Sequence, residues 1–192
     1  RAVHMAKIPL WYTQGFNPHA FITFALPLSL GMTGERESMD MKIDETKITE
    51  NEILSRLQQA LPPDLPVFAV TEPKMKPGKI AFASYTLRME PEKEELSEFR
   101  QKWEDFLNQE TILTQKKSKS GMLTLDIKPD IKNLKIREEE GRIVSDFLLP
   151  AGSEYNVNPS LLVETFRAQT EKEFYCEYIR RYLYDASMKI FE

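Results

Sequence analysis

The chain has 192 residues, of which 41% are hydrophobic and 29% are charged, and its formal net charge is -4. This is ordinary globular composition, and the length suffices for one large or two small domains with a buried core. The acidic balance argues against a protein that binds nucleic acid over its whole surface, but it is compatible with a local basic groove. No apolar run approaches the ~18 residues that a membrane helix needs.

Cysteine usage limits the cofactors that this chain can hold. Cys176 is the single cysteine, so the chain forms no internal disulfide, which fits a reducing cytoplasm. An iron–sulfur cluster usually needs several thiolates, and a closed structural zinc site needs four ligands. With His4 and His19 as the only histidines, we expect no metal site in this chain. The sequence also has no Gly-rich phosphate loop and no GxSxG elbow.

The first half of the chain predicts a helix, two strands, a second helix and a third strand. Thr49 and Glu52 fit a capping box, which marks the start of the second helix, and Pro62 ends it. Because Arg1 would lie inside the first helix, we expect a further segment to precede it. The expected elements are a helix over 1–8, a buried strand over 20–28, a half-buried strand over 38–43, a helix over 50–61 and a short strand over 67–70.

The second half predicts three strands, a two-stranded hairpin and two helices. Its expected elements are a strand over 80–89, a helix over 92–108, a hairpin of 111–116 with 122–128, a strand over 142–149, a helix over 158–168 and a strand over 174–183. We therefore predict an α+β fold with two ferredoxin-like (βαββαβ) halves in tandem, the first lacking its opening strand. The expected domains are residues 1–73 and 79–192, joined by a linker over 74–78.

The most unusual stretch is the loop Tyr12–His19, which holds turn formers, neutral hydrogen-bonding groups, two aromatic rings and a histidine. Loops that gather such groups on a rigid scaffold often bind a ligand. The rings could stack on a base while the amides read its edge. The alternative is that the rings plug the core and the turn formers only shape the loop. The candidate ligand-binding residues here are Tyr12, Gln14, Gly15, Phe16, Asn17 and His19.

These residues carry a resemblance to a known family. The stretches YTQGFNPH and FITFALPLSLG, preceded by Arg1-Ala2 and followed by Glu37 and Asp40, are similar to the N-terminal half of the radical SAM-linked family (domain of unknown function 2344). The resemblance adds Glu37 and Asp40 to the candidate ligand-binding residues. It also implies that a strand and a Ser-His-Leu-Asp stretch would precede residue 1, so the chain looks like a divergent member that lacks this N-terminal segment.

The resemblance implies a partner rather than a reaction. Family members commonly accompany a radical SAM enzyme, which would carry S-adenosylmethionine and an iron–sulfur cluster, with cobalamin as a further candidate cofactor. The family's paired arginines fall at His4 and Met5 here, and its Pro-Lys falls at Ala20 and Phe21. If those basic positions bind an anion, this chain has lost much of that charge.

His19 is a weak candidate for a catalytic acid or base, which would need an orienting acid. Glu37 and Asp40 are three residues apart on a predicted strand and would point to opposite faces, which limits joint action. A histidine that only locks the loop through hydrogen bonds is the favoured interpretation. A second candidate set, for contact with a phosphate, is the hairpin tip with Lys116, Lys117 and Lys119, for which a solvated turn is the simpler interpretation.

We therefore expect a bacterial cytoplasmic binding or adaptor module, without catalytic residues of its own, that presents an RNA or protein substrate to a partner radical SAM enzyme. The alternative is a metal-free RNA-processing or RNA-modifying enzyme that uses His19, by fold analogy alone. A third interpretation is that the loop only locks the fold. We expect no membrane contact, and the sequence predicts neither the substrate nor the oligomeric state.

Overall fold

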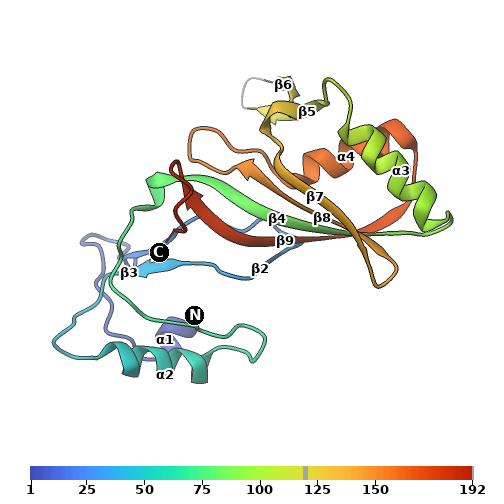
Figure 1. Ribbon diagram of the computed structural model, residues 1–192. Coiled ribbons are helices and arrows are strands. Elements are labelled where there is room, and N and C mark those ends of the chain that lie inside the picture. The colour runs from blue at the N-terminus through green and yellow to red at the C-terminus, as the bar shows by residue number, and fades with distance from the viewer. Residues whose placement is uncertain (119–120, 192) are drawn as a thin grey trace. The chain divides into compact units, whose positions relative to one another are not determined.

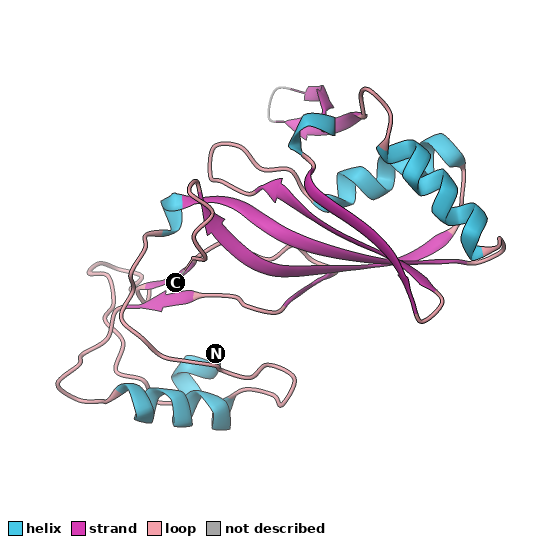
Figure 2. Cartoon of the chain, in the orientation of Figure 1, coloured by secondary structure: helices cyan, strands magenta, loops and turns pink. Residues whose placement is uncertain are grey.

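The computed structural model describes residues 1–118 and 121–191, with helices and strands in both halves (Figures 1 and 2). The predicted α+β class is confirmed. The chain divides into two compact units. Unit 1 comprises residues 1–25 and 38–76, and unit 2 comprises residues 26–37 and 77–191. Within the described residues, no helix is both long enough and apolar enough to cross a membrane.

Unit 1 is built on two helices and a small antiparallel ladder. The helices are α1 (Ala2–Met5) and α2 (Glu50–Ala60), and the ladder pairs β1 (Ile22–Phe24) with β3 (Met39–Met41). The predicted capping box of α2 is confirmed, since the Glu52 amide donates to Thr49 Oγ1 and the Thr49 amide donates to Glu52 Oε2. The core of this unit consists of Val3, Ala6, Ile8, Ile48, Ile53 and Leu57.

The ladder of unit 1 has one face on this core and one face in solvent. Ile22, Met39 and Met41 pack against the core. Successive strand residues alternate between faces, so Thr23 and Asp40, which are register partners, point outward. Strand β1 is therefore half-buried to exposed. The expected buried strand over 20–28 is wrong, because only three of those residues are in β1 and one side of β1 meets water.

Unit 2 contains a five-stranded sheet in the order β2-β9-β4-β8-β7. The strands are β2 (Met32–Gly34), β4 (Ile80–Pro91), β7 (Lys132–Glu139), β8 (Arg142–Pro150) and β9 (Phe174–Asp185). Two helices, α3 (Leu96–Leu107) and α4 (Pro159–Thr170), lie on the same side of the sheet in Figure 1. The remaining elements are the hairpin β5 (Leu113–Ser118) and β6 (Gly121–Asp126) and the short 3-10 helices η1 (Pro77–Lys79) and η2 (Lys128–Asp130).

An aromatic cluster forms the core between the helices and the sheet of unit 2. Trp103 of α3 meets Phe166 of α4 edge-on, with ring centroids 4.9 Å apart, and Phe99 meets Phe174 of β9 at 5.1 Å. The Trp103 indole donates to Ser145 Oγ at 2.8 Å, so the one polar atom of this buried ring is satisfied. The predicted helix start at Asn158 is also confirmed, because its side chain accepts from the Ser160 amide.

Unit 2 connects its elements in the order β4, α3, β7, β8, α4, β9, with the β5–β6 hairpin inserted after α3. This β-α-β-β-α-β order is the one expected for a single ferredoxin-like half. A tandem arrangement is not confirmed. In unit 1 the expected strand over 67–70 is absent, and β2, from the part of the chain predicted to belong to the first half, pairs in parallel with β9 of unit 2.

The segment 26–37 is held in unit 2 by a buried arginine. Arg180 of β9 has a side chain that is only 4% exposed, and its guanidinium donates to Glu37 through both Nε and Nη2. The same guanidinium donates to the carbonyls of Leu26, at 2.6 Å, and Pro27, at 3.4 Å. Gly34 leaves the room that Glu37 needs, because a Cβ at that position would strike the Glu37 carboxylate.

Glu37→Gln is predicted to destabilise unit 2, because it removes the charge that compensates the buried Arg180 guanidinium. The expected loss in free energy of unfolding is about 1–3 kcal/mol, measured by chemical denaturation. The matched control is Glu35→Gln, whose carboxylate pairs with the partly exposed Arg181. Such a surface pair contributes under about 1 kcal/mol. Equal effects of the two substitutions would contradict the anchoring role of Arg180.

Candidate functional site

The loop Tyr12–His19 leaves the body of unit 1 between two paired residues, Tyr12 and Ala20. Its ends are clamped by two hydrogen bonds: the Thr13 amide donates to the His19 carbonyl at 2.8 Å, and the His19 amide donates to Thr13 Oγ1 at 2.9 Å. Gly15 has φ 137°, a conformation that side chains rarely allow. Phe16 is fully exposed. The chain therefore presents this ring to solvent rather than packing it into the core.

Backbone pairing places two further aromatic rings beside a lysine. The Trp11 amide donates to the Lys42 carbonyl at 2.8 Å, and the Lys42 amide donates to the Phe21 carbonyl at 2.9 Å. The Lys42 ammonium lies over both rings, 5.2 Å from the Trp11 centroid and 5.5 Å from the Phe21 centroid. The Trp11 indole donates to the Ile43 carbonyl at 3.0 Å, which fixes that ring. We call Trp11, Phe21 and Lys42 the aromatic face.

Tyr12 and His4 form a contact at the foot of the loop. The Tyr12 hydroxyl lies 3.3 Å from His4 Nε2 and 3.4 Å from Nδ1, and the ring centroids are 6.1 Å apart. His4 is one of the positions where the resembled family has an arginine. The tyrosine is thereby tied to α1, while its exposed edge stays open to solvent.

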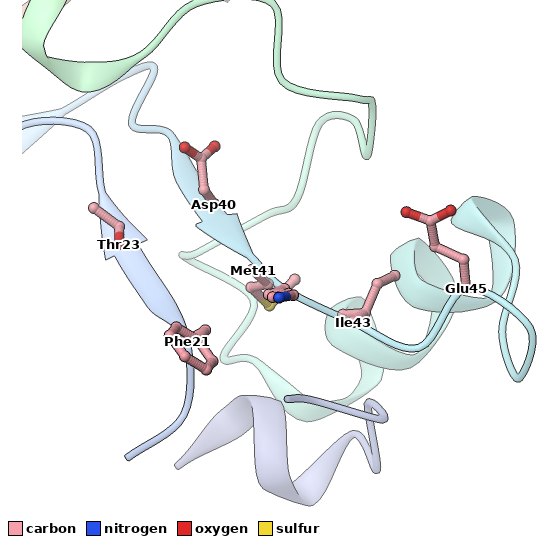
Figure 3. Close-up of a pocket in the computed structure, with 7 residues that line it drawn as sticks. Phe21, Thr23, Asp40, Met41, Ile43 and Glu45 are labelled. Carbon is pink, nitrogen blue, oxygen red and sulfur yellow. The ribbon is translucent and has the colours of Figure 1, made fainter. Parts of the chain in front are cut away.

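An open hollow of about 450 Å³ adjoins the aromatic face (Figure 3). In Figure 3, Thr23 and Asp40 lie on the neighbouring strands β1 and β3, and Phe21 lies further along the ladder. Its volume is in the range of sites that take a small molecule. The lining residues are Phe21, Thr23, Asp40, Met41, Lys42, Ile43 and Glu45.

The carboxylates around this hollow differ in their partners. Asp44, next to the hollow, accepts from the side chains of Lys47 and Thr46, and these hydrogen bonds lower the pKa of Asp44 below its usual value. Asp40 and Glu45 line the hollow itself, and within the described chain neither carboxylate has a hydrogen-bond or ion-pair partner. Asp40 is half-buried and Glu45 is exposed. Two acceptor groups are therefore left open to a ligand.

The predicted loop residues divide by what they contact. The side chains of Gln14 and Asn17 are exposed and make no hydrogen bond within the described residues. The His19 ring likewise makes no hydrogen bond within the described residues, so no acid orients it, and the hydrogen bonds that close the loop come from the His19 backbone rather than from the imidazole. Tyr12, Gly15, Phe16 and Asp40 lie in the same unit as these residues.

Other predicted site residues lie elsewhere. Glu37 belongs to unit 2, where both of its carboxylate oxygens receive hydrogen bonds from Arg180. Lys116 donates to the Asn156 carbonyl at 2.7 Å, so its ammonium is engaged by the protein itself. The Lys117 side chain and all of Lys119 lie outside the described residues. Their role, and the ligand-binding role of the loop residues, stay predictions.

Sequence reasoning missed Trp11, Phe21, Thr23 and Lys42 as parts of a site. Part of the signal was present: in the alternating stretch 38–43, Lys42 has the same parity as Asp40, so both must share one face of the strand. The pairing of residues 10–12 with 20–21 and 42–43 depends on long-range hydrogen bonds that no local pattern encodes.

The arrangement offers ring faces for stacking, one ammonium donor and two carboxylate acceptors. Among the described residues, no group of three or more histidine, cysteine or acidic side chains could hold a metal ion. In unit 2, burial raises the pKa of the Cys176 thiol to about 12, so this cysteine stays protonated and weakly nucleophilic at neutral pH. The groups of the aromatic face and its hollow are therefore suited to binding a planar ligand.

The chain belongs to the family described as "Uncharacterized protein conserved in bacteria (DUF2344)", whose model matches residues 1–159. The match includes all of unit 1 and ends at the first residue of α4. No curated protein matches the chain, and no solved structure matches it.

Three substitutions in the loop distinguish a ligand-binding loop from one that only locks the fold. Gln14→Ala and Asn17→Ala are expected to change the free energy of unfolding by less than about 0.5 kcal/mol, because their exposed side chains make no hydrogen bond within the described residues. Thr13→Ala removes the acceptor for the His19 amide and is expected to cost about 1 kcal/mol. Chemical denaturation measures all three, and a loss of about 1–2 kcal/mol for Gln14→Ala or Asn17→Ala would favour the structural lock.

Proposed function

We propose that this family member is a binding module, without catalytic residues of its own, that holds single-stranded RNA for a partner radical SAM enzyme. The observation that carries the proposal is the exposure of Trp11, Phe16 and Phe21 in one small unit, where Lys42 lies over the Trp11 and Phe21 rings and Phe21 lines an open hollow. Exposed rings on a rigid scaffold are the usual platform for unstacked bases.

The energetics favour stacking over bulk charge. Stacking of one base on one aromatic side chain is worth about 1–3 kcal/mol, and it tolerates any base. The aromatic face provides a single ammonium, that of Lys42, and the whole chain has a net charge of -4. Affinity must then come mainly from rings and hydrogen bonds, which distinguishes this site from a basic groove that follows the phosphate backbone.

The radical SAM partner rests on the resemblance of the QGFNPH stretch and its flanks to that family. It also fits the cysteine count, because a chain whose only cysteine is Cys176 cannot ligate an iron–sulfur cluster alone. S-adenosylmethionine, the cluster and any cobalamin would be bound by the partner. This chain would contribute recognition of the substrate.

The RNA proposal is tested by titrating the protein with a single-stranded decamer of uridine at two salt concentrations. We expect binding whose log K falls with log[salt] with a slope no steeper than about -2, since few cations contact phosphates. Phe16→Ala is expected to weaken binding at least about fivefold. The control is Phe68→Ala, another exposed phenylalanine of unit 1, on the segment that packs near α2. Undetectable binding at low salt would remove RNA as the ligand.

The partner and the lack of activity are tested separately. When the tagged protein is purified from its own bacterium under native, anaerobic conditions, we expect a radical SAM enzyme to co-purify, detected by mass spectrometry. The isolated chain is expected to leave RNA intact, with and without His19→Ala. RNA cleavage by the chain alone that His19→Ala abolishes would reverse the proposal and favour an enzyme with His19 as acid or base.

A further inference from the structure

Asp40 is the polar group of the hollow that the stacking argument does not use. It lies in the middle of β3, directly opposite Thr23 of β1, and it lines the hollow together with Phe21 (Figure 3). Its carboxylate has no hydrogen-bond or ion-pair partner within the described residues. A half-buried carboxylate beside an aromatic ring loses hydration when a ligand covers it, so the ligand must offer donors in return.

Lys42 supplies the complementary group two residues along the same strand. Strand residues i and i+2 share a face and lie roughly 6.5–7 Å apart. The pair is not an ion pair, because the Lys42 ammonium lies over the rings of Trp11 and Phe21 instead. One edge of the hollow thus accepts hydrogen bonds and the neighbouring edge donates them.

The four RNA bases differ in what they can offer to this pair. An ionised carboxylate only accepts, and its two oxygens are best matched by two adjacent donors. On its Watson–Crick edge guanine has two such donors, the N1–H and the N2 amine, followed by the O6 acceptor. Adenine and cytosine each have one amine beside acceptors, and uracil has one N–H between two carbonyls.

We infer that the hollow of unit 1 selects guanine. The Asp40 carboxylate accepts from N1–H and N2–H, the base lies against Phe21, and the Lys42 ammonium moves off that ring to donate to O6. The inference rests on the proposed function and adds a base preference to it. Asp40 is then the residue that determines specificity, and the rings supply the sequence-independent part of the affinity.

The test uses pentamers that differ only in the central base: UUGUU, UUAUU, UUCUU, UUUUU and the inosine pentamer UUIUU, each titrated calorimetrically. We expect UUGUU to bind about tenfold or more tighter than UUUUU, the range for a good bidentate contact to a base. UUIUU, which lacks the N2 amine, is expected to lie between them. Asp40→Asn is expected to reduce the preference of UUGUU over UUUUU to less than about twofold.

Asp64→Asn is the matched control, because it removes the same charge from an exposed aspartate of the same unit that does not line the hollow. It is expected to leave the preference for UUGUU unchanged, which separates a contact by Asp40 from a general effect of charge. Equal binding of all pentamers by the unmodified protein would overturn the guanine preference and leave the proposed function standing. Binding of no pentamer would overturn both. Retained preference in Asp40→Asn would assign the selectivity to other groups and overturn the role of Asp40.

Discussion

The packing of Met39 and Met41 against the helices of unit 1 decides which side chains of that unit reach solvent. A strand has two faces, so once these methionines are turned toward the core, Asp40 and Lys42 must be turned away from it. A shift of one residue in the register of β3 would bury an aspartate and a lysine and expose the methionines. The hydrophobic core of unit 1 therefore fixes the positions of the polar groups that line the hollow.

Glu37, in contrast to Asp40, is an acidic residue whose carboxylate is engaged by the protein itself. The Arg180 side chain is only 4% exposed, and burying its charge is costly unless the charge is compensated. The Glu37 carboxylate supplies the opposite charge, and the carbonyls of Leu26 and Pro27 accept from the same guanidinium. Glu37 and Asp40 both match the resembled family, yet they lie in different units and have different surroundings. The shared spacing of two acids in a sequence is thus compatible with one structural carboxylate and one that is open to a ligand.

Local patterns predicted a helix start in each unit but missed two strands of unit 2. The capping box at Thr49 and the N-cap at Asn158 are short-range signals, and both helix starts are where they were expected. The strand β7 was missed because seven of its eight side chains are exposed, so a hydrophobic alternation is lacking. Strand β2 was missed because it is three residues long and pairs with β9, nearly 150 residues later in the chain; this pairing is a tertiary effect.

The site was predicted in the same uneven way. The unusual composition of residues 12–19 drew attention to the loop, and the structure leaves its rings and amides exposed. The aromatic face was out of reach, because Trp11, Phe21 and Lys42 meet only after three separate segments have paired. Composition reports which groups are available, whereas the donor–acceptor order of Lys42 and Asp40 depends on the register of a single short ladder. Under the proposed function, a site built in this way takes its specificity from the geometry of a few groups, so the net charge of -4 does not conflict with the recognition of bases.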